Sequence, residues 1–209
     1  MFTDEQFEQA IKELDEPDLT DYEFFTESTG VKIYRKYNST SGLYEYKTFG
    51  GIGDVPPDIC AAVYTDLEYR KKWDSYVKEL YTFQEGDKEG VYWRVAFPFP
   101  LANRDYVFMR ETREFDRDGR HIWVCLGRST PFPSKQEKSG VVRVRDFYQS
   151  MTITADKNGT KAFMEYYDDP RGNIPTWLIN WAAKTGVPGF LKTMLTACQG
   201  YKQFLESKK

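Results

Sequence analysis

The spacing of apolar residues changes along the chain, and each change predicts a different element. Residues 4–14 carry apolar side chains three and four positions apart, which is typical of a short amphipathic helix. Val31–Tyr37 and Leu43–Phe49 are rich in β-branched and aromatic residues, and residues 38–42 between them are turn formers. The first part of the chain is therefore expected to form a helix followed by a β-hairpin.

The middle of the chain predicts one helical stretch and then a series of strands. Asp54–Asp58, which contains two prolines, resembles the start of a helix, and apolar residues at helical spacing follow as far as Trp73. Strand candidates come next, separated mostly by Gly, Asn, Asp or Pro. They span residues 76–84, 90–97, 105–115, 120–129, 140–153 and 160–168. Consecutive strands joined by short turns favour an antiparallel sheet.

The last part of the chain is helical again. Trp177–Lys184 predicts a short helix, Gly186–Gly189 interrupts the pattern, and a long apolar stripe follows with spacings of three and four over about five turns. The residues of the stripe are Val187, Phe190, Leu191, Met194, Leu195, Cys198, Tyr201, Phe204 and Leu205. The order of elements predicts one α+β domain over residues 1–209, in which an antiparallel sheet grips the terminal helix.

Composition and charge narrow the possible function classes. The 209-residue chain is 40% hydrophobic and 17% aromatic. The aromatic share is high, so the fold must provide a place for many aromatic side chains. The formal net charge is −3 with acidic and basic residues interspersed, so a nucleic-acid partner is not expected. The acidic start does not resemble a signal peptide, and no apolar run is long enough to span a bilayer. A cytoplasmic protein is therefore expected.

Groups for covalent chemistry are scarce in the sequence. The only histidine, His121, lies in a strand pattern, and the cysteines do not form a zinc or disulfide motif, so no catalytic residue, metal or cofactor is expected. Asp74, Asp105 and Asp146 lie in apolar stretches, where the paired carboxylates of a hydrolase could act. Each lies within four residues of an arginine, and these neighbours are Arg70, Arg104 and Arg145. Ion pairs are favoured, and a small-molecule hydrolase is kept as an alternative.

Four segments of the chain resemble the START-domain family of lipid carriers. They are Tyr69–Asp74, Val91–Pro100, Asn103–Val107 and Ile174–Lys184. The similarity extends from about Phe7 to Tyr201, nearly the whole chain. The resemblance implies a non-enzymatic carrier with the helix-grip (START) fold, a curved antiparallel β-sheet wrapped around a long C-terminal helix and enclosing a lipid cavity. This fold agrees with the order of elements predicted above.

The resemblance also implies a site for a lipid headgroup. In the family's phosphatidylcholine carrier an aromatic cage holds the choline, and the matching residues here are Trp93, Tyr106 and Phe147. A quaternary ammonium has no N–H to donate, but aromatic faces attract it, by about 2 kcal/mol or more when it is desolvated. The family's carrier has tyrosine where this chain has Phe147, and strand alternation sends Tyr148 to the opposite face. Choline binding is therefore expected to be weaker.

A partner for the lipid phosphate follows from the same resemblance. Arg70 matches the family's phosphate-pairing arginine, and Asp74 one turn later can hold its guanidinium. The planar guanidinium suits a phosphate because it can donate two parallel hydrogen bonds. Tyr64 and Gln149 match further polar contacts near the glycerol and the phosphate.

A lipid carrier must enclose its cargo in transit and release it at a membrane. At about 0.8 kcal/mol per CH₂, exposing two acyl chains of about sixteen carbons each to water would cost about 20 kcal/mol or more. The C-terminal helix is the expected lid, and Gly186–Gly189 is its expected hinge. Trp177, Trp181 and the Phe97–Asn103 loop are expected to contact the bilayer, because Trp favours the membrane interface.

The sequence therefore predicts an intracellular lipid transfer protein that carries one glycerophospholipid, with phosphatidylcholine favoured, between membranes. The expected form is a cytoplasmic monomer that touches membranes transiently, with its protein partners left unassigned. Two alternatives stay open besides the hydrolase. One is a START carrier of phosphatidylethanolamine, ceramide or sterol, and the other is a protein-interaction or lipid-sensing module that transfers no lipid.

Overall fold

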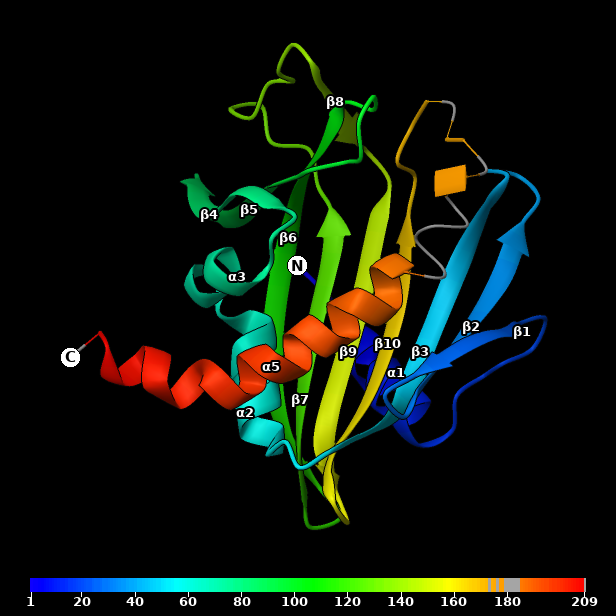
Figure 1. The fold of residues 1–209 in the computed structure, drawn as a ribbon, viewed down its shortest axis with the longest axis vertical. Coiled ribbons are helices and arrows are strands. Elements are labelled where there is room, and N and C mark those ends of the chain that lie inside the picture. Colours follow the sequence, from blue (N-terminus) through cyan, green and yellow to red (C-terminus); the bar gives the residue numbers. More distant parts are fainter. Residues whose placement is uncertain (173, 176, 179–184, 209) are drawn as a thin grey trace.

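One large β-sheet with helices on both faces forms the part of the chain that the structure, a computed structural model, describes (Figure 1). The described residues are 1–172, 174–175, 177–178 and 185–208. The helices are α1 Asp4–Asp15, α2 Pro57–Thr65, α3 Leu67–Trp73 and α5 Val187–Glu206. The strands are β1 Glu23–Ser28, β2 Val31–Asn38, β3 Leu43–Gly53, β4 Val77–Glu85, β5 Lys88–Val95, β6 Asn103–Arg117, β7 Arg120–Ser129, β8 Val141–Val144, β9 Phe147–Asp156 and β10 Gly159–Asp168.

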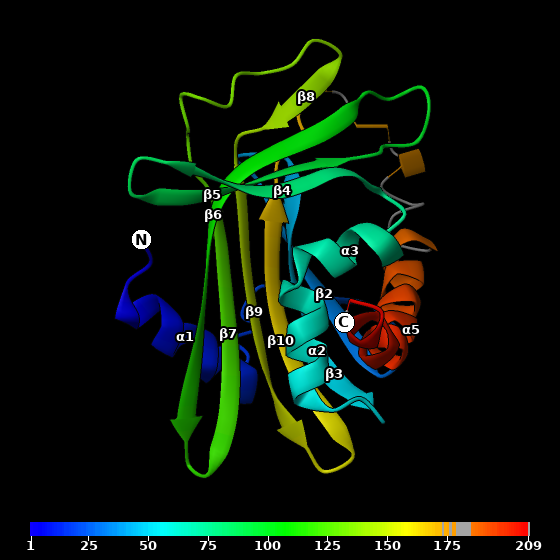
Figure 2. The same cartoon turned by 90° about the vertical axis from the view of Figure 1, so that its left-hand side faces the viewer.

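The strands follow one antiparallel path through the sheet. Their order is β1-β2-β3-β10-β9-β7-β6-β5-β4, and β8 is added beside β6 in the parallel direction. Figure 2 shows α1 on one face of the sheet and α2, α3 and α5 on the other, with β4 and β5 running across one end of the longer strands. The predicted α+β architecture, with an antiparallel sheet and a long C-terminal helix, is confirmed.

The central strand β7 is apolar on both of its faces. Ile122, Val124 and Leu126 are fully buried against α1. Trp123 and Cys125 alternate with them and pack with residues of α2 and α5. Because successive side chains of a strand point to opposite faces, both helical layers need apolar partners from this strand. This explains why its sequence is a continuous apolar run and not an alternating one.

The helix α1 is specified both at its start and along one side. Thr3 and Gln6 form a capping box, in which each side chain accepts a hydrogen bond from the other residue's main-chain N–H. Phe7 and Leu14 then pack on the outer face of the sheet and are almost completely buried. The helix predicted over residues 4–14 is confirmed.

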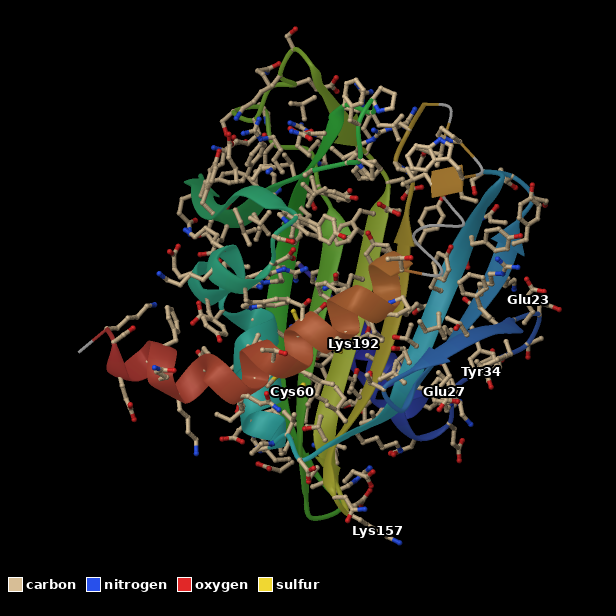
Figure 3. All side chains as sticks on the ribbon, in the orientation of Figure 1. Glu23, Glu27, Tyr34, Cys60, Lys157 and Lys192 are labelled. Carbon is tan, nitrogen blue, oxygen red and sulfur yellow. The ribbon has the colours of Figure 1, made fainter. Side chains whose placement is uncertain are left out.

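The helix α5 crosses the opposite face of the sheet (Figure 1). Figure 3 shows Cys60 of α2 close beneath it, and Met194 and Cys198 of α5 belong to the same core cluster as Cys60. The Tyr69 hydroxyl of α3 donates a hydrogen bond to the main-chain oxygen of Ala197 at 2.8 Å. Apolar packing and a buried hydrogen bond therefore both hold α5 against α2 and α3.

Two predicted elements differ in extent from the observed ones, and one strand was not predicted. The helical stretch expected up to Trp73 is two helices, because Asp66 leaves helical geometry and its carboxylate caps α3 by accepting from the Tyr69 N–H at 2.9 Å. The strand candidate over residues 140–153 is divided into β8, which pairs with β6, and β9, which pairs with β7 and β10. The strand β1 was missed because it is an exposed edge strand with an irregular register, which weakens the period-two pattern.

The predictions for the region before α5 fall partly outside the described residues. Trp177 lies in a helical turn, whereas Trp181 and the rest of residues 179–184 are not described. Gly186–Gly189, expected as a hinge, forms the N-cap and the first turn of α5. The hinge movement itself stays a prediction.

The buried carboxylate Asp105 pairs with an arginine that is distant in sequence. It is 1% exposed and accepts from Arg143 twice, from Nε at 2.8 Å and from Nη2 at 2.9 Å. Arg104, its expected partner, instead donates to three main-chain carbonyls. That expectation was wrong because neighbouring strand residues point to opposite faces, whereas Arg143 is the direct cross-strand partner of Asp105 on β8.

We expect Arg143→Ala to destabilise the protein strongly. The substitution leaves the Asp105 carboxylate buried without a cation. Removing one partner of a buried ion pair lowers the free energy of unfolding by about 3 to 5 kcal/mol. Urea denaturation followed by tryptophan fluorescence measures this change.

Arg145→Ala provides the matched control. Arg145, expected to pair with Asp146, binds Glu137 at the surface instead, and its side chain is 64% exposed. Its removal should change the free energy of unfolding by less than about 1 kcal/mol. If Arg143→Ala costs no more than this control, the Asp105–Arg143 pair does not stabilise the fold.

Candidate functional site

Arg70 lies where α3, α5 and β5 come together. The helix places Asp74 one turn after it, and the Arg70 Nε donates to Asp74 Oδ2 at 3.1 Å. The Asp74 carboxylate is almost fully buried and also accepts from the Tyr76 N–H at 3.1 Å. Asp74 therefore holds the guanidinium by one edge, and the Nη groups remain for a further acceptor.

Three aromatic rings from different elements surround the Arg70 guanidinium. Its carbon lies 4.9 Å from the ring centroid of Trp93, 5.5 Å from that of Phe190 and 5.6 Å from that of Trp73. The indole N–H groups of Trp73 and Trp93 are buried and have no hydrogen-bond partner among the described residues. A buried donor without an acceptor costs free energy, so this region is suited to a ligand that brings acceptor oxygens.

The aromatic residues predicted to form a cage lie together on the inner face of the sheet, which is the face under α5. Trp93 and Tyr106 are cross-strand partners on β5 and β6, and their ring centroids are 5.0 Å apart. Phe147 on β9 lies edge to face with Tyr106 at 5.4 Å. Tyr166 on β10, which the sequence did not single out, extends the cluster at 5.9 Å from Phe147. Tyr148 lies on the other face beside α1, as strand alternation predicts.

A carboxylate that sequence reasoning missed adjoins this cluster. The Tyr106 hydroxyl donates to Asp168 Oδ2 at 2.6 Å. Desolvation raises the pKa of Asp168, while hydrogen bonds from Tyr106 and Tyr166 act in the opposite direction. Burial also raises the pKa of both phenols well above the ordinary range, so they act as hydrogen-bond donors. The strand pattern placed Asp168 at the end of a strand, but only the pairing with β9 brings it to this site.

Tyr64 and Gln149 are also brought together, from α2 and β9. The Gln149 amide donates to the Tyr64 hydroxyl. Burial raises the pKa of Tyr64, and the positive charges of Arg70 and Arg110 oppose this rise. Arg110, another residue that the sequence did not single out, extends from β6 and donates to the main-chain oxygen of Thr65 at 3.0 Å. The polar groups predicted for the glycerol and phosphate thus lie near two guanidinium groups.

Exposed aromatic side chains lie on two neighbouring segments. Phe99 is 94% exposed in the predicted Phe97–Asn103 loop, and Trp177 is 47% exposed. Arg104 ties the loop to the segment that leads to Trp177, since it donates to the main-chain oxygens of Ala102 at 2.6 Å and Pro170 at 2.9 Å. Among the described residues, no helix combines the length and the apolar character that crossing a membrane requires.

The sequence has close relatives among characterised proteins. Phosphatidylcholine transfer protein from Rattus norvegicus is 52% identical over 203 residues, which cover 96% of this chain and 95% of that protein. The Homo sapiens protein of the same name is 51% identical with the same coverage. StAR-related lipid transfer protein 7, mitochondrial, from Mus musculus is 31% identical over 89% of this chain and 50% of its own length.

Solved structures and a family model agree with these relatives. The crystal structure of human STARD10 superimposes with a TM-score of 0.81 at 23% identity, covering 99% of this chain and 84% of that one. Human StAR-related lipid transfer protein 5 gives a TM-score of 0.72 at 14% identity, covering 95% and 97%. At such low sequence identity, both similarities establish only that the fold is shared. The model described as the START domain matches residues 9–203, and the chain therefore belongs to the START domain family.

Proposed function

We propose that this protein carries one phosphatidylcholine molecule between membranes and catalyses no covalent reaction. The observation that carries the proposal is the contact between Arg70 and Trp93, because a cation suited to a phosphate lies beside an aromatic ring suited to a choline. Phosphate and ammonium are joined by a short linker in this headgroup, so their partners in the protein must be neighbours. The 52% identity with rat phosphatidylcholine transfer protein supports the same cargo.

The phosphate is bound by the Arg70 guanidinium. Asp74 occupies Nε, so the guanidinium is oriented before the lipid arrives and offers its Nη groups to the phosphate oxygens. The unpartnered indole N–H groups of Trp73 and Trp93 are further donors beside it. A hydrogen bond to a charged group contributes about 1.5 to 3 kcal/mol, which makes Arg70 the main determinant of phosphate binding.

The choline is bound by the aromatic cluster of Trp93, Tyr106 and Phe147. The ring centroids of Trp93 and Tyr106 are 5.0 Å apart, and those of Tyr106 and Phe147 are 5.4 Å apart. A small cation can therefore contact more than one ring. Phenylalanine at position 147 keeps the ring that attracts the cation and lacks only the hydroxyl. A quaternary ammonium forms no hydrogen bond with a hydroxyl, so the substitution preserves the main attraction.

The acyl chains lie between the inner face of the sheet and α5. The apolar side chains that pack there include Trp123, Cys125, Met151, Ile153, Ala162, Met164, Met194 and Leu195. Burying two acyl chains among such residues avoids a cost of about 20 kcal/mol in water. Because α5 covers this face, the lipid can enter only when α5 or the adjoining loops move.

Two of the three carboxylates considered for hydrolysis are held in ion pairs, which disfavours a catalytic role. Asp74 holds Arg70, and Asp105 holds Arg143 through two hydrogen bonds. A general acid or base would first have to leave these ion pairs. The alternative carriers differ in their cargo, because phosphatidylethanolamine, ceramide and sterol differ from phosphatidylcholine in the headgroup that this site would contact. An interaction or lipid-sensing module would transfer no lipid, so the transfer assay described below separates it from a carrier.

Lipid exchange takes place where exposed aromatic side chains meet the membrane. Phe99 and Trp177 are exposed on segments joined through Arg104, so they can enter one membrane surface together. Trp181 belongs to the same stretch of sequence and is proposed to act with them. The protein acts as a cytoplasmic monomer that touches the membrane only during exchange.

Arg70→Ala is expected to slow the transfer of fluorescent phosphatidylcholine between vesicles by at least about tenfold, because the phosphate loses a charge-assisted hydrogen bond. Transfer is measured by fluorescence dequenching, and bound lipid by native mass spectrometry. Since the substitution also leaves Asp74 buried without a cation, Arg70→Ala/Asp74→Asn is measured beside it to separate binding from folding.

Lys71→Ala is the matched control for this experiment. Lys71 is the next residue of α3, is exposed and, among the described residues, pairs only with Glu68 at the surface. Its removal should leave transfer unchanged. Normal transfer by the folded double variant would contradict the phosphate role of Arg70.

Phe99→Ser and Trp177→Ala are expected to lower vesicle binding and the transfer rate by about fivefold each, since partial burial of a large apolar side chain contributes about 1 kcal/mol. Trp181→Ala should act in the same direction. The lipid bound in solution should stay at the wild-type level, because these side chains act at the membrane. Vesicle flotation and the dequenching assay measure the two effects.

Phe24→Ser is the control for the membrane-contact variants. Phe24 is 57% exposed on the edge strand β1, away from the Phe99 loop. If Phe24→Ser reduces vesicle binding as much as Phe99→Ser does, any exposed aromatic side chain promotes vesicle binding. That result would contradict a defined membrane-contact surface at Phe99 and Trp177.

A further inference from the structure

The aromatic cluster of the site has opposite charges at its two ends. At one end the Arg70 guanidinium carbon lies 4.9 Å from the Trp93 ring centroid. Trp93 contacts Tyr106 at 5.0 Å, and at the other end the Tyr106 hydroxyl donates to Asp168 at 2.6 Å. A cation, two aromatic rings and a carboxylate therefore follow one another across the site.

Asp168 is a partly buried carboxylate that has no ion-pair partner among the described residues. Arg104 is near enough to influence it, but the Arg104 guanidinium donates its hydrogen bonds to three main-chain carbonyls. Tyr106 and Tyr166 donate to Asp168 and carry no charge. Desolvating a carboxylate charge costs free energy unless a cation compensates it. A negative charge on Asp168 would therefore favour a cationic ligand.

Asp168 is also adjacent to the cage residue in which this chain differs from the family's carrier. The pairing of β9 with β10 sets Asp168 directly opposite Phe147. Cross-strand partners share one face of the sheet, so the carboxylate and the phenyl ring border the same space. A ligand cation held against Phe147 would therefore lie beside a negative charge.

We propose that Asp168 is a specificity-determining residue, whose negative charge opposite Arg70 makes the site complementary to a zwitterionic headgroup and unfavourable to an anionic one. This inference rests on the proposed binding of phosphatidylcholine. The quaternary ammonium cannot donate a hydrogen bond to the carboxylate, so the attraction acts through charge alone. Charge interactions are stronger in a site screened from water, which makes the carboxylate effective without direct hydrogen bonding.

Hydrogen bonding to the tyrosines does not require a carboxylate at this position. The side-chain oxygen of asparagine would accept from the Tyr106 hydroxyl equally well. It would also avoid the cost of desolvating a charge. The hydrogen bonds with the tyrosines therefore do not require an ionisable side chain at position 168, whereas attraction of a bound cation does.

The test is the headgroup preference of Asp168→Asn. Dioleoyl phosphatidylcholine and dioleoyl phosphatidylglycerol, which share their acyl chains, each compete against a fluorescent phosphatidylcholine bound to the protein. The wild type should prefer phosphatidylcholine, and Asp168→Asn should reduce this preference by about tenfold or more, mainly through weaker binding of phosphatidylcholine. The melting temperature should not fall, because the substitution removes a desolvated charge.

Asp169→Asn is the matched control. Asp169 is the next residue and pairs with Arg171 at 3.2 Å, so its substitution removes the same charge without reaching the cage. Its headgroup preference should equal that of the wild type.

The ratio of the two affinities makes the outcome independent of stability. A general weakening of the fold lowers both affinities and leaves their ratio unchanged, which would overturn the role of Asp168 while phosphatidylcholine binding by the wild type still stands. Equal effects of Asp168→Asn and Asp169→Asn would also overturn it. Failure of the wild type to bind phosphatidylcholine would instead refute the proposed function.

Discussion

The ion pair between Arg70 and Asp74 is the constraint that fixes the position of the guanidinium in the proposed site. Asp74 accepts from the guanidinium Nε at 3.1 Å, and the rings of Trp73, Trp93 and Phe190 surround its carbon. Asp66 contributes to this, because it caps α3 and also accepts a hydrogen bond from the Tyr201 hydroxyl of α5 at 3.1 Å. The residue that caps the helix bearing Arg70 thus also contacts the proposed lid, so a movement of α5 would affect the proposed phosphate site.

The two faces of the sheet are used in different ways. The face under α1 carries fully buried residues such as Phe7 and Phe163, beside a pocket that Tyr148 and Glu165 line. The inner face carries partly exposed side chains such as Trp123 and Met164 between the sheet and the helices. Since β7 contributes to both faces, the stable core on one side supports the inner face on the other (Figure 2).

The proximity of the candidate site residues could be predicted in part, because family resemblance assigns positions that periodicity cannot, whereas their roles stay predictions. The resemblance pointed to Arg70 and to the cage residues, which the structure brings into one cluster. Asp168 and Tyr166 were missed because their importance comes from the strands beside them and not from their own sequence neighbours. The membrane-contact role of Trp181 is a prediction that concerns a residue outside the described part of the chain.

The sequence by itself determined the helix α1, the β2–β3 hairpin, the apolar stripe of α5 and the α+β class, because periodicity reports which side of an element is buried. Only the tertiary structure decided which residues meet across the sheet. Asp105 pairs with Arg143, 38 residues away, and Tyr106 binds Asp168, 62 residues away. These partners depend on strand order and register, which arise from the packing of the whole sheet and leave no signal within any single strand.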